Sequence, residues 1–524
     1  MLMDEATRLE DAANNLTQRN YRAAHAACME ALRINPQSAQ AFYLLGVLTA
    51  DHTNHAKAIE LFDRSLALAP DNPIYLAERA RSRVALFDRE RALEDARAAA
   101  GMTQLSARTL DTIGVVHSRL GLHADATPFF RRAVEKEPDN PSFLYNLGSA
   151  LQFEGSFGEA EIAFRRALAI EPGNVRAWSS LVTMRRQTKE RNDVAVLEAL
   201  FPKLSQADDR LHIGHALAKA SEDLGDADAA MQWLGEAKAL KREATPYDLA
   251  EIGDLFAAAA ETVRSFRSAA SGSRDAPIFI VGLPRTGTTL VDRILSSHSQ
   301  VSSAGELSDF ALQTKRATQT PSPFVLDAET LRAAGKIDLA GVGESYIIRA
   351  QRVVGNVPHF IDKMPLNFFY AALILRALPN ARIICLRRNP ADTVLSNYRQ
   401  LFATAFTYYR YAYDLTWTAD YYARFDELMG VCREHLPSDR FTEVAYEDLV
   451  TNIESEARRL VAFCGLDWQE HCLAFHENAA PVATASSSQV RQPLYATSMH
   501  RWRRYRESLQ PALEVLSARG IRYE

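Results

Sequence analysis

The segment 282–289 carries residue types that can bind phosphate. It follows the apolar run 278–281, which is expected to form a strand buried on both faces of a parallel sheet. Gly282 and Gly287 allow a tight turn, so backbone amides and the start of the next helix can converge on an anion. The spacing matches the nucleotide-binding loop G-x-x-x-x-G-K-[ST], except that Thr288 replaces the lysine that reaches the outer phosphates. We therefore predict a ligand with a 5′-phosphate that need not be ATP.

A cation and three hydroxyl groups support a binding role for this loop. The candidate ligand-binding residues are Arg285, Thr286, Gly287, Thr288 and Thr289. The alternative interpretation is that the two glycines make only a tight strand-to-helix turn.

A second candidate anion site follows a later apolar run. Arg388 stands at the end of an expected strand, and Ser396 lies eight residues further on in the following helix. A guanidinium fork and a hydroxyl group suit a second phosphate. The alternative is a solvated arginine beside a serine on the helix surface.

The elements that must position these residues form an α/β pattern. Strands are expected near 277–282, 358–362, 381–387 and 440–446, and longer amphipathic segments separate them. Because ligands bind beyond the carboxyl ends of the strands in open sheets of this type, both candidate anion sites are expected at one edge of the sheet.

The first half of the chain contains a repeat of 34 residues. The repeated positions hold Ala24, Ala58, Ala92, Ala126 and Ala160; glycines Gly46, Gly114 and Gly148; aromatics Phe62, Phe130 and Phe164; and prolines Pro36, Pro70, Pro138 and Pro172. This pattern resembles the tetratricopeptide repeat, a helix-turn-helix unit of that length. Beyond about residue 175 the period blurs, although Trp178, Ala230 and Ala237 indicate two degenerate or capping units.

The resemblance implies an all-α superhelix whose concave groove holds an extended peptide. The alternative is that the repeats serve only as a scaffold or as a surface for homodimerisation. We predict three parts: a tetratricopeptide domain at 1–243, a helical linker at 244–272 and a P-loop-like α/β domain with a parallel sheet at 273–524.

Composition excludes several classes of protein. The formal net charge of −5 over 524 residues gives no reason to expect nucleic acid as a partner. Five cysteines without a C-x-x-C pair indicate neither a disulfide framework nor a zinc site, and no metal-ligand cluster is visible. An acidic amino terminus and the lack of a long apolar stretch predict a cytoplasmic protein without membrane insertion.

The two anion motifs together resemble a known cofactor site. PRTGTT at 284–289 and RNPADTVLS at 388–396 are similar to the motifs with which sulfotransferases bind 3′-phosphoadenosine 5′-phosphosulfate (PAPS). The resemblance implies that the first loop binds the 5′-phosphosulfate. It implies further that Arg388 and Ser396 bind the 3′-phosphate.

Further motifs resemble the tyrosylprotein sulfotransferases and their bacterial relatives. AGE at 304–306 and DKMP at 362–365 follow in the order found in that branch. The resemblance implies that Glu306 is the catalytic base, and that Lys363 and Arg285 stabilise charge on the transferring group. The stretch 484–505 resembles the segment that closes over the cofactor. Its candidate residues are Ser486, Ser487, Ser488, Gln489 and Arg491.

The resemblance therefore implies a metal-independent enzyme that moves a sulfuryl group from PAPS to an acceptor hydroxyl, protein tyrosine among them. The tyrosylprotein enzymes are lumenal, membrane-anchored and disulfide-linked, and this sequence shows none of these features. A carbohydrate, lipid or small phenol thus stays open as the acceptor. Two rival functions are an NTPase or kinase, whose loop lysine is missing here, and a repeat-based adaptor with an inactive transferase domain.

Overall fold

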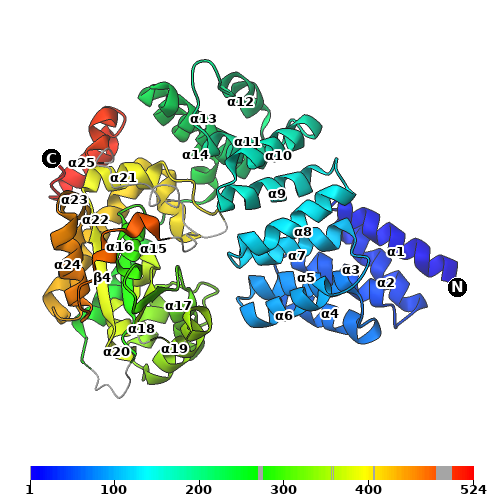
Figure 1. Ribbon diagram of the computed structural model, residues 1–524, viewed down its shortest axis with the longest axis horizontal. Coiled ribbons are helices and arrows are strands. Elements are labelled where there is room, and N and C mark those ends of the chain that lie inside the picture. Colours follow the sequence, from blue (N-terminus) through cyan, green and yellow to red (C-terminus); the bar gives the residue numbers. More distant parts are fainter. Residues whose placement is uncertain (1, 269–274, 356, 358, 405–406, 479–498) are drawn as a thin grey trace. The chain divides into compact units, whose positions relative to one another are not determined.

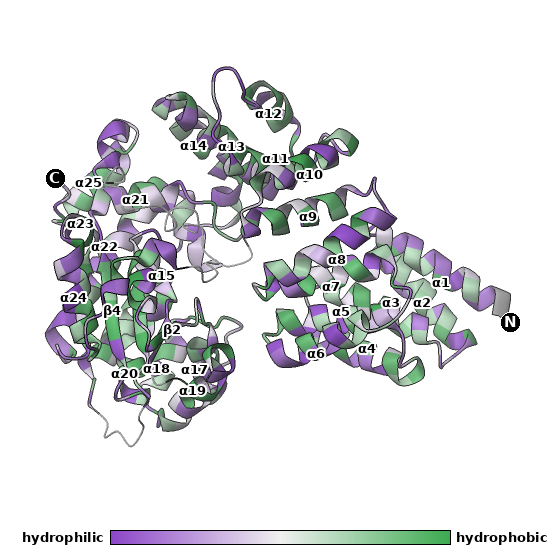
Figure 2. Cartoon of the chain, viewed as in Figure 1, coloured by the Kyte–Doolittle hydropathy of each residue, from purple (hydrophilic) through white to green (hydrophobic). Residues whose placement is uncertain are grey.

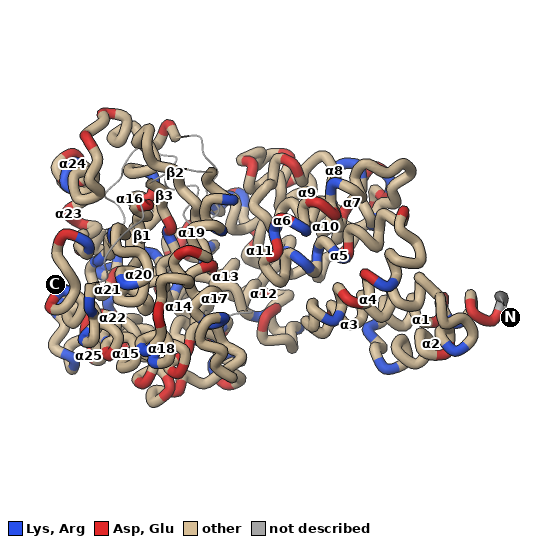
Figure 3. Tube along the Cα trace, turned by 90° about the horizontal axis from the view of Figure 1, so that it is seen from below, with Lys and Arg blue, Asp and Glu red and all other residues tan. Residues whose placement is uncertain are grey.

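The structure is a computed structural model that describes residues 2–268, 275–355, 357, 359–404, 407–478 and 499–524. The chain divides into two compact units, Met1–Leu200 and Phe201–Glu524, and each is described by itself (Figure 1). Acidic and basic residues are interspersed along the helices of both units (Figure 3). None of the helices in the described ranges is long and apolar enough to cross a membrane.

The first unit consists of antiparallel helix pairs, as the 34-residue period predicts. The helices are α1 (Leu2–Thr17), α2 (Tyr21–Ile34), α3 (Ala39–Asp51), α4 (His55–Leu68), α5 (Pro73–Ala85), α6 (Arg89–Ala100), α7 (Ala107–Arg119), α8 (His123–Lys136), α9 (Pro141–Glu154), α10 (Phe157–Ile170), α11 (Val175–Met184) and α12 (Val194–Leu200). Each pair packs on the next, and the repeated alanines are fully buried. Most of these helices are amphipathic and carry both hydrophobic and hydrophilic residues (Figure 2), whereas α3 is apolar over most of its length.

The repeated glycines leave room for the repeated aromatic rings. A Cβ atom added to Gly114 would lie 2.6 Å from Cε1 of Phe130, and one added to Gly148 would lie 2.8 Å from Cε1 of Phe164. In the third repeat, alanines stand at both positions, as Ala80 and Ala96. A glycine in the first helix of a pair therefore occurs together with a phenylalanine in the second helix of the same pair.

We expect Gly114→Ala to lower the free energy of unfolding by about 1–2 kcal/mol, because the new methyl group overpacks the ring of Phe130. Helix propensity alone would favour alanine by about 1 kcal/mol. Urea unfolding followed by circular dichroism measures the difference. The matched control is Gly158→Ala in α10, where a Cβ atom meets no heavy atom within 4 Å and stability should not fall. Equal shifts in the two variants would contradict the packing argument, and a Phe130→Ala background should abolish the penalty.

The second unit contains a five-stranded parallel sheet in the order β2-β3-β1-β4-β5. The strands are β1 (Ile278–Gly282), β2 (Val301–Ser303), β3 (His359–Asp362), β4 (Arg382–Arg387) and β5 (Phe441–Ala445). The α/β fold is thus confirmed, with four strands at the predicted places. β2 was not predicted, because three residues of mixed burial carry no readable period.

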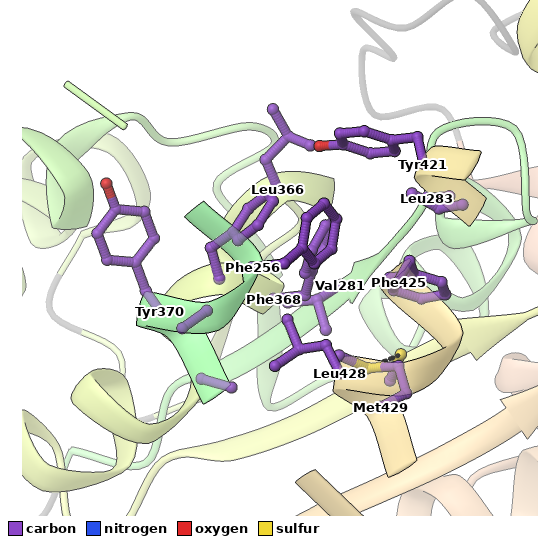
Figure 4. Close-up of a cluster of buried hydrophobic side chains, with 14 of the residues drawn as sticks. Phe256, Val281, Leu283, Leu366, Phe368, Tyr370, Tyr421, Phe425, Leu428 and Met429 are labelled. Atoms are coloured by element: carbon purple, nitrogen blue, oxygen red, sulfur yellow. Dashed lines mark hydrogen bonds between the residues drawn. The ribbon is translucent and has the colours of Figure 1, made fainter. Parts of the chain in front are cut away.

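Helices of the second unit surround this sheet, and some of them cover its two faces. They are α13 (Ala207–Leu224), α14 (Ala227–Ala244), α15 (Leu249–Arg264), α16 (Thr288–Ser296), α17 (Asp309–Thr318), α18 (Ala328–Ala334), α19 (Ala340–Val354), α20 (Ala371–Ala377), α21 (Pro390–Tyr398), α22 (Leu415–His435), α23 (Tyr446–Thr451), α24 (Ile453–Phe463) and α25 (Gln510–Ala518). Alternate strand residues enter two separate cores, so that Phe279 and Val281 join one and Ile278 and Ile280 the other. Figure 4 shows part of the larger core, around Val281 and Phe368.

The helical hairpin α13–α14 packs with the sheet unit. Ala218, Met231 and Leu234 of this hairpin belong to the same hydrophobic core as Phe279 of β1. α15, which lies in the segment predicted as a linker, buries Phe256 in that core. The compact unit thus begins before residue 243. The predicted domain boundaries, after residues 243 and 272, divide the chain by its sequence patterns and stay a prediction.

Candidate functional site

Three neighbouring strands bring the predicted site residues to one edge of the sheet. β1 lies between β3 and β4, and all three run parallel. The segments that leave their carboxyl ends are 283–287, 363–364 and 388–389. They therefore meet where ligands bind in open α/β sheets.

The loop after β1 has a backbone that requires its glycines. The φ angles are 140° at Gly282 and 103° at Gly287, and Arg285 also adopts a left-handed φ of 67°. A Cβ atom on Gly282 would lie 2.6 Å from the carbonyl oxygen of Leu386, and one on Gly287 2.5 Å from the ring of Tyr446. Strain at a non-glycine residue is a common feature of binding loops.

The hydroxyl residues of the loop are buried around the start of α16. Thr286 donates through Oγ1 to the carbonyl oxygen of Leu283 at 2.7 Å, which closes the turn. Thr288 and Thr289 are the first two residues of α16, and their amides belong to the orphan donors of a helix start. Amides, hydroxyl groups and the Arg285 guanidinium form a donor set that fits an anionic group.

Arg388 lies beside this loop. Its Nη1 donates to the carbonyl oxygen of Arg285 at 3.0 Å, and its guanidinium lies 5.0 Å from the ring centroid of Tyr446. The structure therefore brings the two predicted phosphate sites together. Ser396 lies near the other end of α21, where it is half-buried.

Glu306 and Lys363 form an ion pair at the same edge. Glu306 follows β2 and Lys363 follows β3, and the lysine Nζ contacts the glutamate Oε1. The backbone N–H of Lys363 also donates to the carbonyl oxygen of Gly305 at 2.8 Å. The lysine side chain is 2% exposed, whereas the glutamate side chain is 40% exposed. A carboxylate that faces solvent is thus held by a buried ammonium group.

Asp362 orders the backbone around this pair. It is fully buried, and its Oδ1 accepts from the N–H of Leu307 at 3.3 Å and of Met364 at 3.1 Å. Its Oδ2 accepts from the hydroxyl group of Tyr346 at 2.9 Å. Desolvation raises the pKa of Asp362 to about 7, although these hydrogen bonds oppose the rise.

Sequence reasoning missed Asn397 and the tyrosines of the segment 407–413. Asn397 is buried in α21 and donates through Nδ2 to the carbonyl oxygen of Pro284 at 2.8 Å, which anchors the phosphate loop. Burial and then the negative charge of Glu306 raise the pKa of Tyr408 to about 12. The tyrosine-rich run TYYRYAY at 407–413 was the sequence signal that could have indicated this segment.

The predicted lid residues, Ser488 and Arg491 among them, lie outside the described residues, together with Ser486, Ser487 and Gln489. Across the ranges that the structure describes, His, Cys, Asp and Glu side chains form no group of three that could hold a metal ion.

Family models match both halves of the chain. The model of the Sulfotransferase family matches residues 277–470, and the Tetratricopeptide repeat model matches 14–73 and 112–175. The first range contains both anion motifs and the Glu306–Lys363 pair.

Individual proteins also match. An uncharacterized protein of Aquifex aeolicus (strain VF5) is 32% identical over 413 residues, which cover 75% of this chain and 52% of the relative. The protein-tyrosine sulfotransferase of Drosophila melanogaster is 26% identical over 254 residues, or 44% of this chain and 48% of the relative. Protein-tyrosine sulfotransferase 2 of Gallus gallus is 24% identical over 245 residues, or 44% of this chain and 64% of the relative. The chain thus spans less than two thirds of each relative.

A solved thermophilic tetratricopeptide protein of Thermus thermophilus aligns with 34% of this chain and 98% of its own, at 21% identity and a TM-score of 0.31. The assignment of the repeats depends instead on the family model and on the observed helix pairs. Tetratricopeptide repeats in the first half of the chain are thus joined to a segment that matches the Sulfotransferase family.

Proposed function

We propose that the protein transfers a sulfuryl group from PAPS to an acceptor hydroxyl, and that the acceptor is a tyrosine of a polypeptide. The observation that carries the proposal is the meeting of an anion-binding loop, a second guanidinium and a carboxylate–ammonium pair at one sheet edge. The family match and the names of the Drosophila and Gallus relatives support the same reaction and acceptor.

Two groups of residues would hold PAPS. The loop 285–289 offers amides, hydroxyl groups and a guanidinium to the 5′-phosphosulfate. Arg388 and Ser396 would take the 3′-phosphate, and Ser488 and Arg491 of the proposed lid would cover the nucleotide. When bound, PAPS supplies an activated sulfuryl group, with adenosine 3′,5′-bisphosphate as the product that leaves.

Proton transfer would fall to Glu306. Its exposed carboxylate can accept the proton of the acceptor hydroxyl at Oε1 or Oε2. Lys363 forms an ion pair with this carboxylate, and an ammonium group has further N–H donors for negative oxygen atoms. Arg285 and Lys363 would stabilise the negative charge that develops at the reacting centre without a metal ion.

The repeats would recruit the polypeptide. Successive first helices of the repeats, α1, α3, α5, α7, α9 and α11, contact one another and so form the inner layer of the superhelix. That layer carries half-buried polar side chains, such as Asn146, which donates a hydrogen bond of 2.8 Å to Asp111. Polar side chains of this kind can form hydrogen bonds with the backbone of an extended peptide.

The test is transfer of labelled sulfate from PAPS into a cell extract, without added magnesium. We expect the full chain to label a polypeptide, and the compact unit 201–524 to label it with kcat/KM reduced by about tenfold or more. Identification of sulfotyrosine in the labelled product would support the acceptor, whereas label in carbohydrate or lipid would overturn it. Equal values of kcat/KM for the full chain and the fragment would contradict the proposal that the repeats recruit the polypeptide. A chain that transfers nothing from PAPS would contradict the reaction itself.

A further inference from the structure

A lysine of the repeat-like hairpin is buried against the transferase elements. Lys238 of α14 is 1% exposed, and its Nζ donates to the carbonyl oxygens of Tyr398 and Ala412, the latter at 2.6 Å. The Nζ also lies 4.1 Å from the ring centroid of Tyr398. A buried ammonium group needs such partners, because its desolvation is costly. One side chain thus joins three segments that are far apart in the sequence.

The two carbonyl groups belong to elements at the site. Tyr398 is the last residue of α21, the helix that follows Arg388, and a cation is favourable at a helix carboxyl terminus. Ala412 belongs to the 3-10 segment Thr407–Tyr413, which also holds Tyr411. Lys238 therefore fixes the end of α21 to this segment.

The neighbouring residues extend this link to the phosphate loop. Tyr411 precedes Ala412, and its hydroxyl group donates to Oδ1 of Asn397 at 2.9 Å. Asn397 precedes Tyr398 and donates through Nδ2 to the carbonyl oxygen of Pro284 at 2.8 Å. Hydrogen bonds, joined by the backbone between the neighbouring residues 397–398 and 411–412, thus lead from α14 to the loop after β1.

The other helix of the hairpin holds the same region. Glu222 of α13 forms an ion pair with Arg399, the residue after Tyr398, and its carboxylate also contacts the hydroxyl group of Tyr505. On α14, Arg242 pairs with Asp414 at 3.1 Å. Glu222 and Arg242 therefore join both helices of the hairpin to residues next to Tyr398 and close to Ala412.

We propose that Lys238 is a positioning residue that sets the conformation of the phosphate loop through Asn397, and that the α13–α14 hairpin is a working part of the donor site. For its effect on catalysis the inference depends on the proposed sulfotransferase activity. Its effect on the loop itself does not depend on that activity. Glu306 and Lys363 follow β2 and β3, outside this series of bonds, so donor binding should change more than turnover.

The experiment uses the full chain with Lys238→Met, which keeps an apolar side chain of similar length but removes all donors. Amide hydrogen exchange of residues 283–289 should become about tenfold faster or more, because Asn397, which anchors the loop, loses the support of α14. The KM for PAPS should rise about tenfold or more, and kcat should fall by a smaller factor, because Arg285 belongs to this loop whereas Glu306 and Lys363 do not. A separate Tyr411→Phe variant removes only the hydroxyl group and should shift both readouts in the same direction by a smaller factor.

Lys241→Met is the matched control. Lys241 lies about one turn further along α14 and pairs with Asp208 of α13, which also accepts a hydrogen bond from Thr404 at 3.4 Å, but this pair lies outside the series of contacts from Lys238 to Pro284. It should leave loop exchange and the KM for PAPS unchanged. The proposal is overturned if Lys238→Met or Tyr411→Phe lowers the melting temperature but leaves exchange at 283–289 as in the parent chain. If Lys238→Met does not fold, Tyr411→Phe alone decides. An inactive parent chain would contradict the sulfotransferase proposal, whereas the exchange measurement would still decide whether Lys238 positions the loop.

Discussion

Glu306→Gln should lower kcat by about 10²–10⁴-fold, the range expected for loss of a general base. Glutamine keeps the size of the side chain and can still accept a hydrogen bond from Nζ of Lys363, so the surrounding structure should persist. Because the carboxylate is exposed beside the loop and not inside it, the affinity for adenosine 3′,5′-bisphosphate should change little. Steady-state kinetics with PAPS and calorimetric titration of the bisphosphate measure the two quantities.

The matched control for Glu306 is Glu329→Gln, an exposed glutamate in the first turn of α18. This variant should keep the kcat of the parent chain. Retention of full kcat in Glu306→Gln would show that another group accepts the proton. A parallel loss of bisphosphate affinity would instead assign Glu306 to donor binding.

Arg388→Ala should weaken the binding of adenosine 3′,5′-bisphosphate by about 100-fold, since hydrogen bonds to charged groups are worth up to about 3 kcal/mol. The substitution also removes the hydrogen bond from Nη1 of Arg388 to the carbonyl oxygen of Arg285, so a part of the loss of affinity acts through the loop. Thermal stabilisation by the bisphosphate without magnesium offers a direct readout, because ligand binding to the folded state raises the melting temperature.

The choice of ligand separates the two contributions of Arg388. Adenosine 5′-phosphosulfate lacks the 3′-phosphate, so its affinity should fall only by the share that acts through the loop. A larger loss for the bisphosphate than for adenosine 5′-phosphosulfate supports a direct contact with the 3′-phosphate. Equal losses for both ligands would assign Arg388 to the support of the loop alone.

The sequence predicted the parts of the site that lie in short motifs. The glycine spacing indicated the loop 282–289, and the fixed step of 34 residues predicted the helix pairs. The ion pair of Glu306 and Lys363 joins residues 57 positions apart, and it was suggested only by the resemblance. Their roles, with those of Arg285, Arg388 and Ser396, stay predictions.

Other features could not be predicted from one sequence. An amphipathic pattern shows which face of a helix is apolar but not which element it meets, so the hairpin α13–α14 looked like more of the repeat array. Lys238 contacts Tyr398 and Ala412 at separations of 160 and 174 residues, and no local pattern encodes such pairs. Asn397 was hidden for the same reason, since its partner Pro284 lies 113 residues away.

The matched glycine and phenylalanine inside a helix pair limit how the repeats can diversify. A repeat of the Gly114–Phe130 kind and one of the Ala80–Ala96 kind are both well filled, yet any single step between them leaves either a hole or a collision. Evolutionary exchange between the two kinds must cross a less stable intermediate or change both positions at once. Engineers who lengthen or shuffle this array should therefore transplant complete helix pairs and cut between them.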